Sequence, residues 1–138
     1  MSKCLVTGGA GFIGSHVVSK LVHNNHEVVV IDNESAEANE AFNWYDETDN
    51  HTVDIRDMDA CRPLFEGVEY VFHLAARSRI QLAMKNPMEC LETNYIGTYN
   101  MLECARQVGA RRFINSSTSS SYGLLNKPPL QELSLIHI

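Results

Sequence analysis

The chain has 138 residues, 44% hydrophobic and 20% charged, with a formal net charge of −6 and a pI near 5.4, as expected for one globular domain. This acidic balance argues against nucleic-acid binding, which requires a basic surface. No apolar run approaches the roughly 20 residues of a membrane helix, and the N-terminus lacks the apolar region of a signal peptide, so we expect a cytoplasmic protein without a membrane partner.

Short apolar segments alternate along the chain with segments of helical periodicity. The pattern predicts strands at 3–7, 27–31, 52–55, 70–74 and 112–116, helices at 12–24, 58–65 and 87–108, and an irregular loop at 32–50. The last helix is expected to bury Cys90, Leu91, Tyr95, Met101, Leu102 and Ala105. Parallel strands need crossover helices, and the crossovers are right-handed. The predicted fold class is therefore α/β, a doubly wound parallel sheet of the Rossmann type.

A glycine-rich turn, TGGAGFIG, follows the first strand and opens the first helix. Gly8, Gly11 and Gly14 satisfy G-x-x-G-x-x-G, and Gly9, Gly11 and Gly14 satisfy the overlapping G-x-G-x-x-G. This spacing lets the chain turn sharply and lets a pyrophosphate approach bare backbone at a helix N-terminus. Taken alone, the same glycines also suit a tight turn without a ligand.

Asp32 ends the second strand about 20 residues after the glycine turn. A carboxylate in this place accepts hydrogen bonds from the hydroxyls of the adenosine ribose. It also repels a 2′-phosphate, and no Arg or Lys lies between Asp32 and His51. The sequence thus predicts NAD rather than NADP as cofactor, with a solvated residue at a strand end as the alternative for Asp32.

The cysteines and histidines show no metal-site spacing. Four cysteines are far apart without a C-x-x-C pair, and no H-x-x-x-H pair occurs. We therefore predict reduced, structural cysteines and no metal site.

Six segments, LVTGGAGFIGSH, VVVIDN, VDIRD, VFHLAA, TNYIGT and SSTSSSYG, together resemble the extended short-chain dehydrogenase/reductase family from residue 3 to about 132. Within that family the sequence is most similar to NAD-dependent nucleotide-sugar epimerases of the UDP-glucose or UDP-N-acetylglucosamine 4-epimerase type. The resemblance implies a pyrophosphate loop at Gly8, Gly11, Phe12, Ile13 and Gly14, ribose contacts at Asp32 and Asn33, and adenine contacts at Asp54 and Ile55. It further implies that the cofactor lies over Leu74, Ala75 and Ala76, with Asn94 near its nicotinamide half.

Some of these implied roles have structural alternatives. Asp54 could instead cap a helix that starts near Asp57. Ala75 and Ala76 are small, as any crowded strand end requires. Asn94 lies in a helix interior, where Asn is unfavourable unless its side chain has a local partner or a functional task. The residues directly after HLAA are Arg77, Ser78 and Arg79. They fit a position near the substrate or a solvated loop equally well.

The resemblance places a catalytic hydroxyl at Thr118, four residues before Tyr122; several neighbouring serines compete, and a serine-rich loop without catalytic role is the alternative. Tyr122 itself is not the family's catalytic tyrosine, which belongs to a Tyr-x-x-x-Lys pair expected near position 143. The family's sugar 4,6-dehydratases carry Asp and Glu directly after the hydroxyl. Ser119 and Ser120 occupy those positions, which argues against dehydration.

The domain organisation that the resemblance implies is an incomplete NAD-binding domain at 1–132, C-terminally truncated, without a substrate domain. Residues 133–138, LSLIHI, resemble the translation of a transposase adapter used in sequencing libraries; a native strand or helix is the alternative. We expect such a fragment to retain cofactor binding at most and to be poorly soluble because apolar surface stays uncovered.

The function implied for the parent protein is epimerisation of a nucleotide sugar of the UDP-hexose type: hydride passes from C4 to NAD and returns to the other face. The parent is expected to be a homodimer that uses its long helix. The alternatives are a non-catalytic, regulatory NAD-binding protein and an extended-family sugar dehydratase or reductase.

Overall fold

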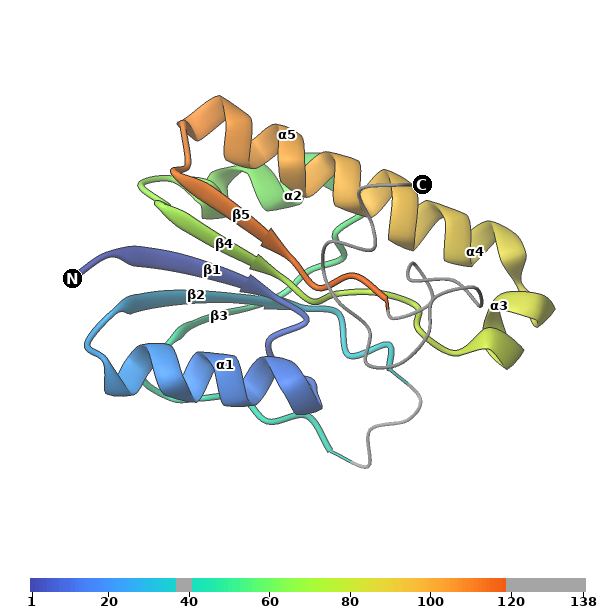
Figure 1. Ribbon diagram of the computed structural model, residues 1–138, viewed down its shortest axis with the longest axis horizontal. Coiled ribbons are helices and arrows are strands. Elements are labelled where there is room, and N and C mark those ends of the chain that lie inside the picture. The colour runs from blue at the N-terminus through green and yellow to red at the C-terminus, as the bar shows by residue number, and fades with distance from the viewer. Residues whose placement is uncertain (37–40, 119–138) are drawn as a thin grey trace, which may run out of the picture.

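Five parallel strands form one sheet at the centre of the computed structural model, which describes residues 1–36 and 41–118 (Figure 1). The strand order is β3-β2-β1-β4-β5, so chain growth reverses direction between β1 and β4. Ligands of open α/β sheets bind beyond the carboxyl ends of the strands at such a reversal. The strands are β1 Lys3–Thr7, β2 Glu27–Asp32, β3 Asp49–Thr52, β4 Tyr70–His73 and β5 Arg112–Asn115.

Helices cover both faces of the sheet, which confirms the predicted doubly wound α/β class. The helix α1, Phe12–His23, lies on one face, and the segments α2 and α5 lie on the other (Figure 1). None of the helices in the described ranges is long and apolar enough to span a membrane. The remaining helical segments are α2 Met58–Cys61, η1 Arg62–Phe65, α3 Ile80–Lys85, α4 Pro87–Leu91, the π-helical η2 Glu92–Gly97 and α5 Thr98–Val108.

Two apolar layers hold this arrangement together, because successive strand residues point to opposite faces. Leu5, Val29 and Val71 are fully or almost fully buried with Phe65 and Met101 on the α5 side. The α1 side is packed by the valines Val6, Val18, Val28 and Val30. Continuous burial of β1 and β2 explains why their sequences are nearly all apolar.

Buried Asn100 joins α5 to the segment after β3. Its side-chain amide donates to the backbone oxygens of Ile55 at 3.1 Å and Arg56 at 2.9 Å. A buried amide of this kind must be paired to avoid a desolvation cost, and here it satisfies two carbonyl groups at once. The pairing ties α5 to the segment that follows β3.

The third strand differs from its prediction. It spans Asp49–Thr52 rather than 52–55, because pairing with β2 sets its register, with Asp49 opposite Val29 and Thr52 opposite Asp32. This edge strand is short and polar, so its sequence carries little of the apolar pattern that identifies a strand.

The predicted buried side of the long helix is also wrong in part. Met101 and Ala105 are buried as expected, whereas Leu91, Tyr95 and Leu102 are 51%, 68% and 46% exposed. The π-helical η2 interrupts the helix between Leu91 and Met101. A π-turn adds a residue to the helical repeat and so rotates the face that the following residues present.

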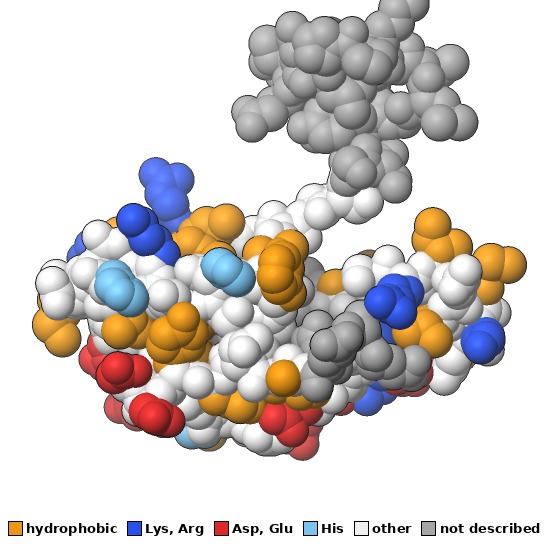
Figure 2. Space-filling model, turned by 90° about the horizontal axis from the view of Figure 1, so that it is seen from below, with side chains coloured by type: hydrophobic (Ala, Val, Ile, Leu, Met, Phe, Trp, Pro, Cys, Tyr) orange, Lys and Arg blue, Asp and Glu red, His pale blue; other side chains and the backbone are white. Residues whose placement is uncertain are grey.

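The face of the sheet that α1 packs against is only partly covered. Phe72 of β4 pairs with Ile114 of β5, and Ile114 is 41% exposed. Figure 2 shows hydrophobic and histidine side chains gathered on this side of the molecule. The expected poor solubility stays a prediction.

Tyr122 and the segment 133–138, interpreted above as adapter-derived, lie outside the described residues.

Candidate functional site

A cleft of about 900 Å³ opens at the carboxyl edge of the sheet, where the ends of β1, β2, β4 and β5 meet. This volume is in the range of small-molecule and cofactor sites. Every residue that the sequence analysis assigned to the cofactor or to catalysis lines it, with the exception of Asp54: Gly8, Gly11, Phe12, Ile13, Gly14, Asp32, Asn33, Ile55, Leu74, Ala75, Ala76, Asn94 and Thr118. The strand ends therefore bring these residues together.

The glycine turn forms the floor of the cleft and leaves no space for side chains. A Cβ on Gly14 would lie 2.0 Å from Gly8 O, and a Cβ on Gly8 would lie 2.8 Å from Ala75 N. Gly8 also has φ +68°, a conformation that other residues rarely adopt. The glycine at position 8 is thus required by its contact with the backbone of Ala75.

The N-terminus of α1 points its free N–H groups toward this floor. No side chain among the described residues caps the helix, its N-cap is Gly11, and its first turn carries no acidic residue. Such a helix end attracts an anion through unpaired N–H groups and the helix dipole. These features suit a pyrophosphate.

Asp32 is buried at the end of β2, which contradicts the alternative of a solvated residue. Its carboxylate accepts hydrogen bonds from Ala10 N at 3.1 Å and Glu34 N at 2.8 Å. Burial raises the pKa of this carboxyl, and backbone hydrogen bonds from Glu34, Ala10 and Gly11 partly offset that effect. A carboxylate has about four lone pairs, so acceptor capacity remains for a diol such as a ribose.

Asp54 lies just outside the cleft and supports its wall. Arg56 donates to the carboxylate at 2.7–3.1 Å, and Asn33 Nδ2 donates at 2.9 Å. The Arg56 guanidinium lowers the pKa of Asp54 to about 2. The capping alternative for Asp54 is wrong, because Asp57 caps α2 by accepting from Ala60 N at 3.0 Å.

The other half of the cleft contains a buried polar cluster, Thr7–His73–Thr98, that the sequence analysis did not identify. Thr7 Oγ1 lies 2.7 Å from His73 Nδ1, and His73 Nε2 lies 2.9 Å from Thr98 Oγ1. Thr7 Oγ1 also accepts from the backbone N–H groups of Leu74 and Ala75, so its own proton is directed to His73 Nδ1. His73 is therefore the Nε2–H tautomer and donates to Thr98.

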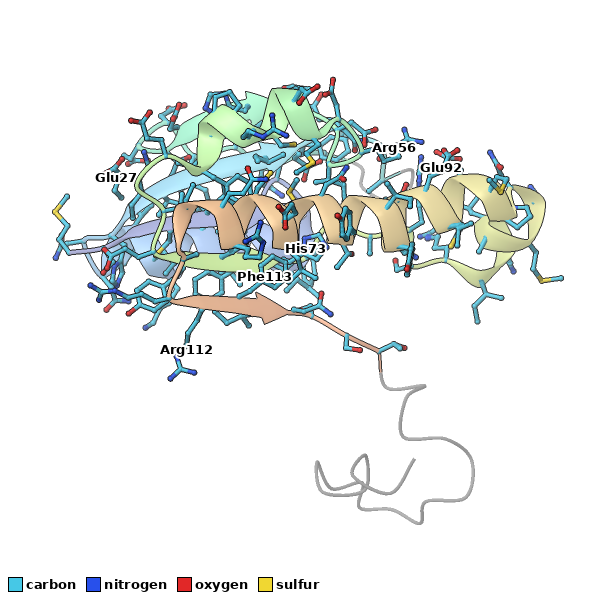
Figure 3. The ribbon with its side chains drawn as sticks, turned by 90° about the horizontal axis from the view of Figure 1, so that it is seen from above. Glu27, Arg56, His73, Glu92, Arg112 and Phe113 are labelled. Atoms are coloured by element: carbon cyan, nitrogen blue, oxygen red, sulfur yellow. The ribbon has the colours of Figure 1, made fainter. Side chains whose placement is uncertain are left out.

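The cluster joins three elements, namely β1, β4 and α5. Burial lowers the pKa of His73 to about 4, so the ring is neutral at physiological pH. Figure 3 shows His73 between the sheet and α5, and its ring centroid lies 5.5 Å from that of Phe113. The only sequence signal for this role is a polar residue at the end of an otherwise apolar strand.

Asn94 has the local partner that its helix position required. Its Oδ1 accepts from Arg77 N at 2.8 Å, and its Nδ2 donates to Arg77 O at 3.0 Å. Both residues line the cleft, so Arg77 belongs to the site, whereas Arg79 is exposed. A nicotinamide contact of Asn94 stays a prediction.

Thr118 lies at the end of the described residues, beyond β5. It lines the cleft together with Asn115, Ser116 and Ser117, and the segment is anchored because Ser116 N donates to His73 O at 3.0 Å. A hydroxyl is thus presented at the carboxyl end of a parallel strand. Its catalytic role stays a prediction.

The fold and the cleft define a Rossmann-type dinucleotide-binding domain. Residues 5–137 match the model of a protein family described as GDP-mannose 4,6 dehydratase. The chain therefore belongs to this family, within the extended short-chain dehydrogenases/reductases, and the resemblance stated above is confirmed.

Individual relatives carry several activities. The chain is 39% identical over 122 residues to UDP-glucuronic acid decarboxylase 1 of Danio rerio. The aligned residues cover 88% of the chain and 28% of that protein. It is 40% identical to UDP-glucose 4-epimerase of Thermotoga maritima, solved with UDP-glucose, with a TM-score of 0.83 over 91% of the chain and 41% of that structure. A UDP-glucose 4-epimerase of Thermus thermophilus, solved with NAD, is 35% identical, with a TM-score of 0.73 over 80% of the chain and 36% of that structure.

These figures show that the chain spans less than half the length of these relatives. The residues of the cleft nevertheless fit NAD, the dinucleotide with which the Thermus thermophilus enzyme was solved. The glycines of the turn carry no side chains, so a pyrophosphate can approach the backbone directly. The uncapped N-terminus of α1 suits the pyrophosphate, and buried Asp32 suits a ribose. The residues that line the cleft are thus compatible with a bound dinucleotide.

We expect the stability of the chain to fall as the pH is lowered from about 6.5 to about 4. His73 has a folded pKa of about 4 against an ordinary value of 6.5, so the unfolded state binds more protons in this window. The contribution of His73 to the free energy of unfolding should therefore drop by about 3 kcal/mol, measured by urea denaturation of wild type and a variant without His73 across the pH range. Asp32, whose pKa is raised by burial, contributes with the opposite sign in both proteins and cancels in this comparison.

A His73→Gln variant supplies the control for this prediction. Gln does not titrate, so the part of the pH dependence that His73 contributes should disappear. Asp54 does not confound the measurement, because its pKa of about 2 places its own loss of stability below pH 3.8. An unchanged pH profile in the variant would show that His73 is not the group responsible.

Proposed function

We propose that this chain is the NAD-binding half of a nucleotide-sugar 4-epimerase acting on a UDP-hexose. The observation that carries the proposal is the convergence in one cleft of the glycine floor, buried Asp32 and the hydroxyl of Thr118. The family is NAD-dependent, and the similarity to the Thermotoga maritima epimerase supports the assignment to this branch. Ser119 and Ser120, in place of the acidic pair of the sugar 4,6-dehydratases, argue against dehydration.

The chain's own residues hold and orient the reactants. Bound NAD supplies an acceptor and donor of hydride for C4 of the sugar. Asp32 holds the adenosine ribose, and the N-terminus of α1 holds the pyrophosphate. Thr118 donates or accepts a hydrogen bond at the reacting sugar oxygen, while the proton itself passes to the tyrosine of the Tyr-x-x-x-Lys pair expected near position 143.

Cofactor preference tests the first half of the proposal. Calorimetric titration of the chain should show tighter binding of NAD than of NADP, because the Asp32 carboxylate repels a 2′-phosphate. Asp32→Asn keeps the shape and one acceptor oxygen, and it should weaken NAD binding on the order of tenfold. Asp59→Asn, which changes an exposed carboxylate on α2, is the control, and this variant should bind NAD as tightly as wild type. A folded chain that binds neither dinucleotide would refute the cofactor site.

Activity tests the second half and requires the protein that includes the Tyr-x-x-x-Lys pair. UDP-glucose or UDP-N-acetylglucosamine should be converted to its 4-epimer without net consumption of NAD. Thr118→Ala should lower kcat roughly 100-fold, as expected for loss of an oriented hydrogen bond in the transition state. Ser117→Ala is the matched control, with a much smaller effect. Release of carbon dioxide from UDP-glucuronate, without epimerisation, would assign the protein to the decarboxylases instead.

The homodimer expected from the resemblance has a suitable surface on the long helix. Large apolar side chains are exposed along α4, η2 and α5, and we call them the apolar stripe. An exposed stripe of this kind on a soluble protein suits a self-complementary interface between two copies. Its members are Met88, Leu91, Tyr95, Tyr99 and Leu102, exposed by 46–68%.

A charge placed in the apolar stripe should dissociate the dimer. Tyr95→Glu would bury a carboxylate at the interface without a partner, so sedimentation equilibrium of the longer protein should detect monomers. Ile80→Glu, an exposed position on α3 outside the stripe, is the control and should stay dimeric. A Tyr95→Glu dimer as tight as wild type would place the interface elsewhere.

A further inference from the structure

We propose that Arg77 is a positioning residue that clasps the loop after β2 across the dinucleotide cleft and thereby slows the release of NAD. The inference rests on the proposed NAD-binding function and adds to it a determinant of cofactor retention. Sequence reasoning left Arg77 open between a substrate-side residue and a solvated charge. The structure places it at neither, since its side chain is only 19% exposed and joins two walls of the cleft.

The clasp connects strand ends that are not neighbours. Arg77 follows β4 and Ser35 follows β2, and β1 lies between these strands in the sheet. Nη1 of Arg77 donates to Ser35 O at 2.8 Å, and Nη2 donates to Oε1 of Glu89 in α4. The glycine turn leaves from the end of β1, so the arginine side chain links the two walls of the cleft on either side of this turn.

Both ends of the clasp are fixed. The Arg77 backbone is held by the two hydrogen bonds with Asn94 described above. Ser35 is held within its loop, because its N–H and its hydroxyl both donate to Asn33 Oδ1, at 3.2 and 2.5 Å. A bond between two ordered groups costs little additional conformational entropy, and a charged donor makes it stronger than a neutral pair.

The charge of Arg77 is compensated by Glu89. This matters for the cofactor, since the clasp brings a cation to a loop whose own sequence has no Arg or Lys between Asp32 and His51. A guanidinium paired with a carboxylate and a carbonyl has fewer donors to offer a 2′-phosphate. The arrangement is therefore compatible with NAD, and its effect falls on retention rather than on the choice between NAD and NADP.

Retention follows from the position of the loop. Asp32 and Asn33, proposed to hold the ribose, lie just before Ser35, so a loop held by Arg77 keeps these residues against the cofactor. Changes within one binding site act mainly on the dissociation rate constant. Breaking the clasp should thus speed release of NAD while leaving its association nearly unchanged.

The test compares Arg77→Met with a control variant, Arg62→Met. Arg62 is an exposed arginine of η1 that pairs with Asp59 of α2 and lies outside the cleft. Stopped-flow displacement of NAD should show a dissociation rate constant raised on the order of tenfold in Arg77→Met and unchanged in Arg62→Met. Glu89→Gln, which removes one anchor and keeps the arginine, should give an intermediate rate. It also serves as the second variant if Arg77→Met does not fold.

A second measurement needs no cofactor. Hydrogen exchange of the Glu34 and Ser35 amides should accelerate by a similar factor in Arg77→Met, whereas amides in the middle of α1 should not change. Wild-type release and wild-type exchange in Arg77→Met would overturn the clasp and leave the proposed function intact. A folded wild type that binds no NAD would refute the proposed function, and the exchange of the two amides would still decide whether Arg77 holds the loop.

Discussion

The contact between the start of α1 and the glycine turn is the constraint on which the site depends. A methyl group on Gly14 would collide with Gly8 O and Gly9 Cα, both backbone atoms that cannot rotate away. The helix therefore starts directly against the turn, and its N-terminus is aimed at the carboxyl edge of the sheet. The same compact turn places Ala10 N on the carboxylate of Asp32, so one short segment sets the positions of both the helix N-terminus and Asp32.

The two halves of the cleft are held by different kinds of interaction. Charged pairs hold the segment after β3, where Arg56 bonds Asp54 and reaches Glu92 at 3.4 Å; Arg56 and Glu92 lie side by side in Figure 3. Neutral hydrogen bonds hold the ends of β1 and β4 against α5, through the Thr7–His73–Thr98 cluster. A charged group there would be costly in a buried environment. A histidine kept neutral by burial fulfils the structural task without this cost.

The parts of the site that could be predicted from sequence are those encoded by short segments. The glycine turn and Asp32 depend on one strand–turn–helix unit and the strand after it, so their spacing and context predicted that they would lie together at the strand ends. The position of β3 was wrong because its polar residues carry no strand pattern and only pairing with β2 defines its register. Arg77 was left open because its partners, Ser35 and Glu89, are 42 and 12 residues away in sequence.

The π-helical η2 explains how one helix serves two different surfaces. The segment before it directs Glu89 toward Arg77, and its own Glu92 and Asn94 reach Arg56 and the Arg77 backbone. After the π-turn, α5 presents Met101, Cys104 and Ala105 to the sheet. A regular α-helix keeps one phase and could not place both sets of residues in this way, whereas the extra residue of a π-turn shifts the phase between them.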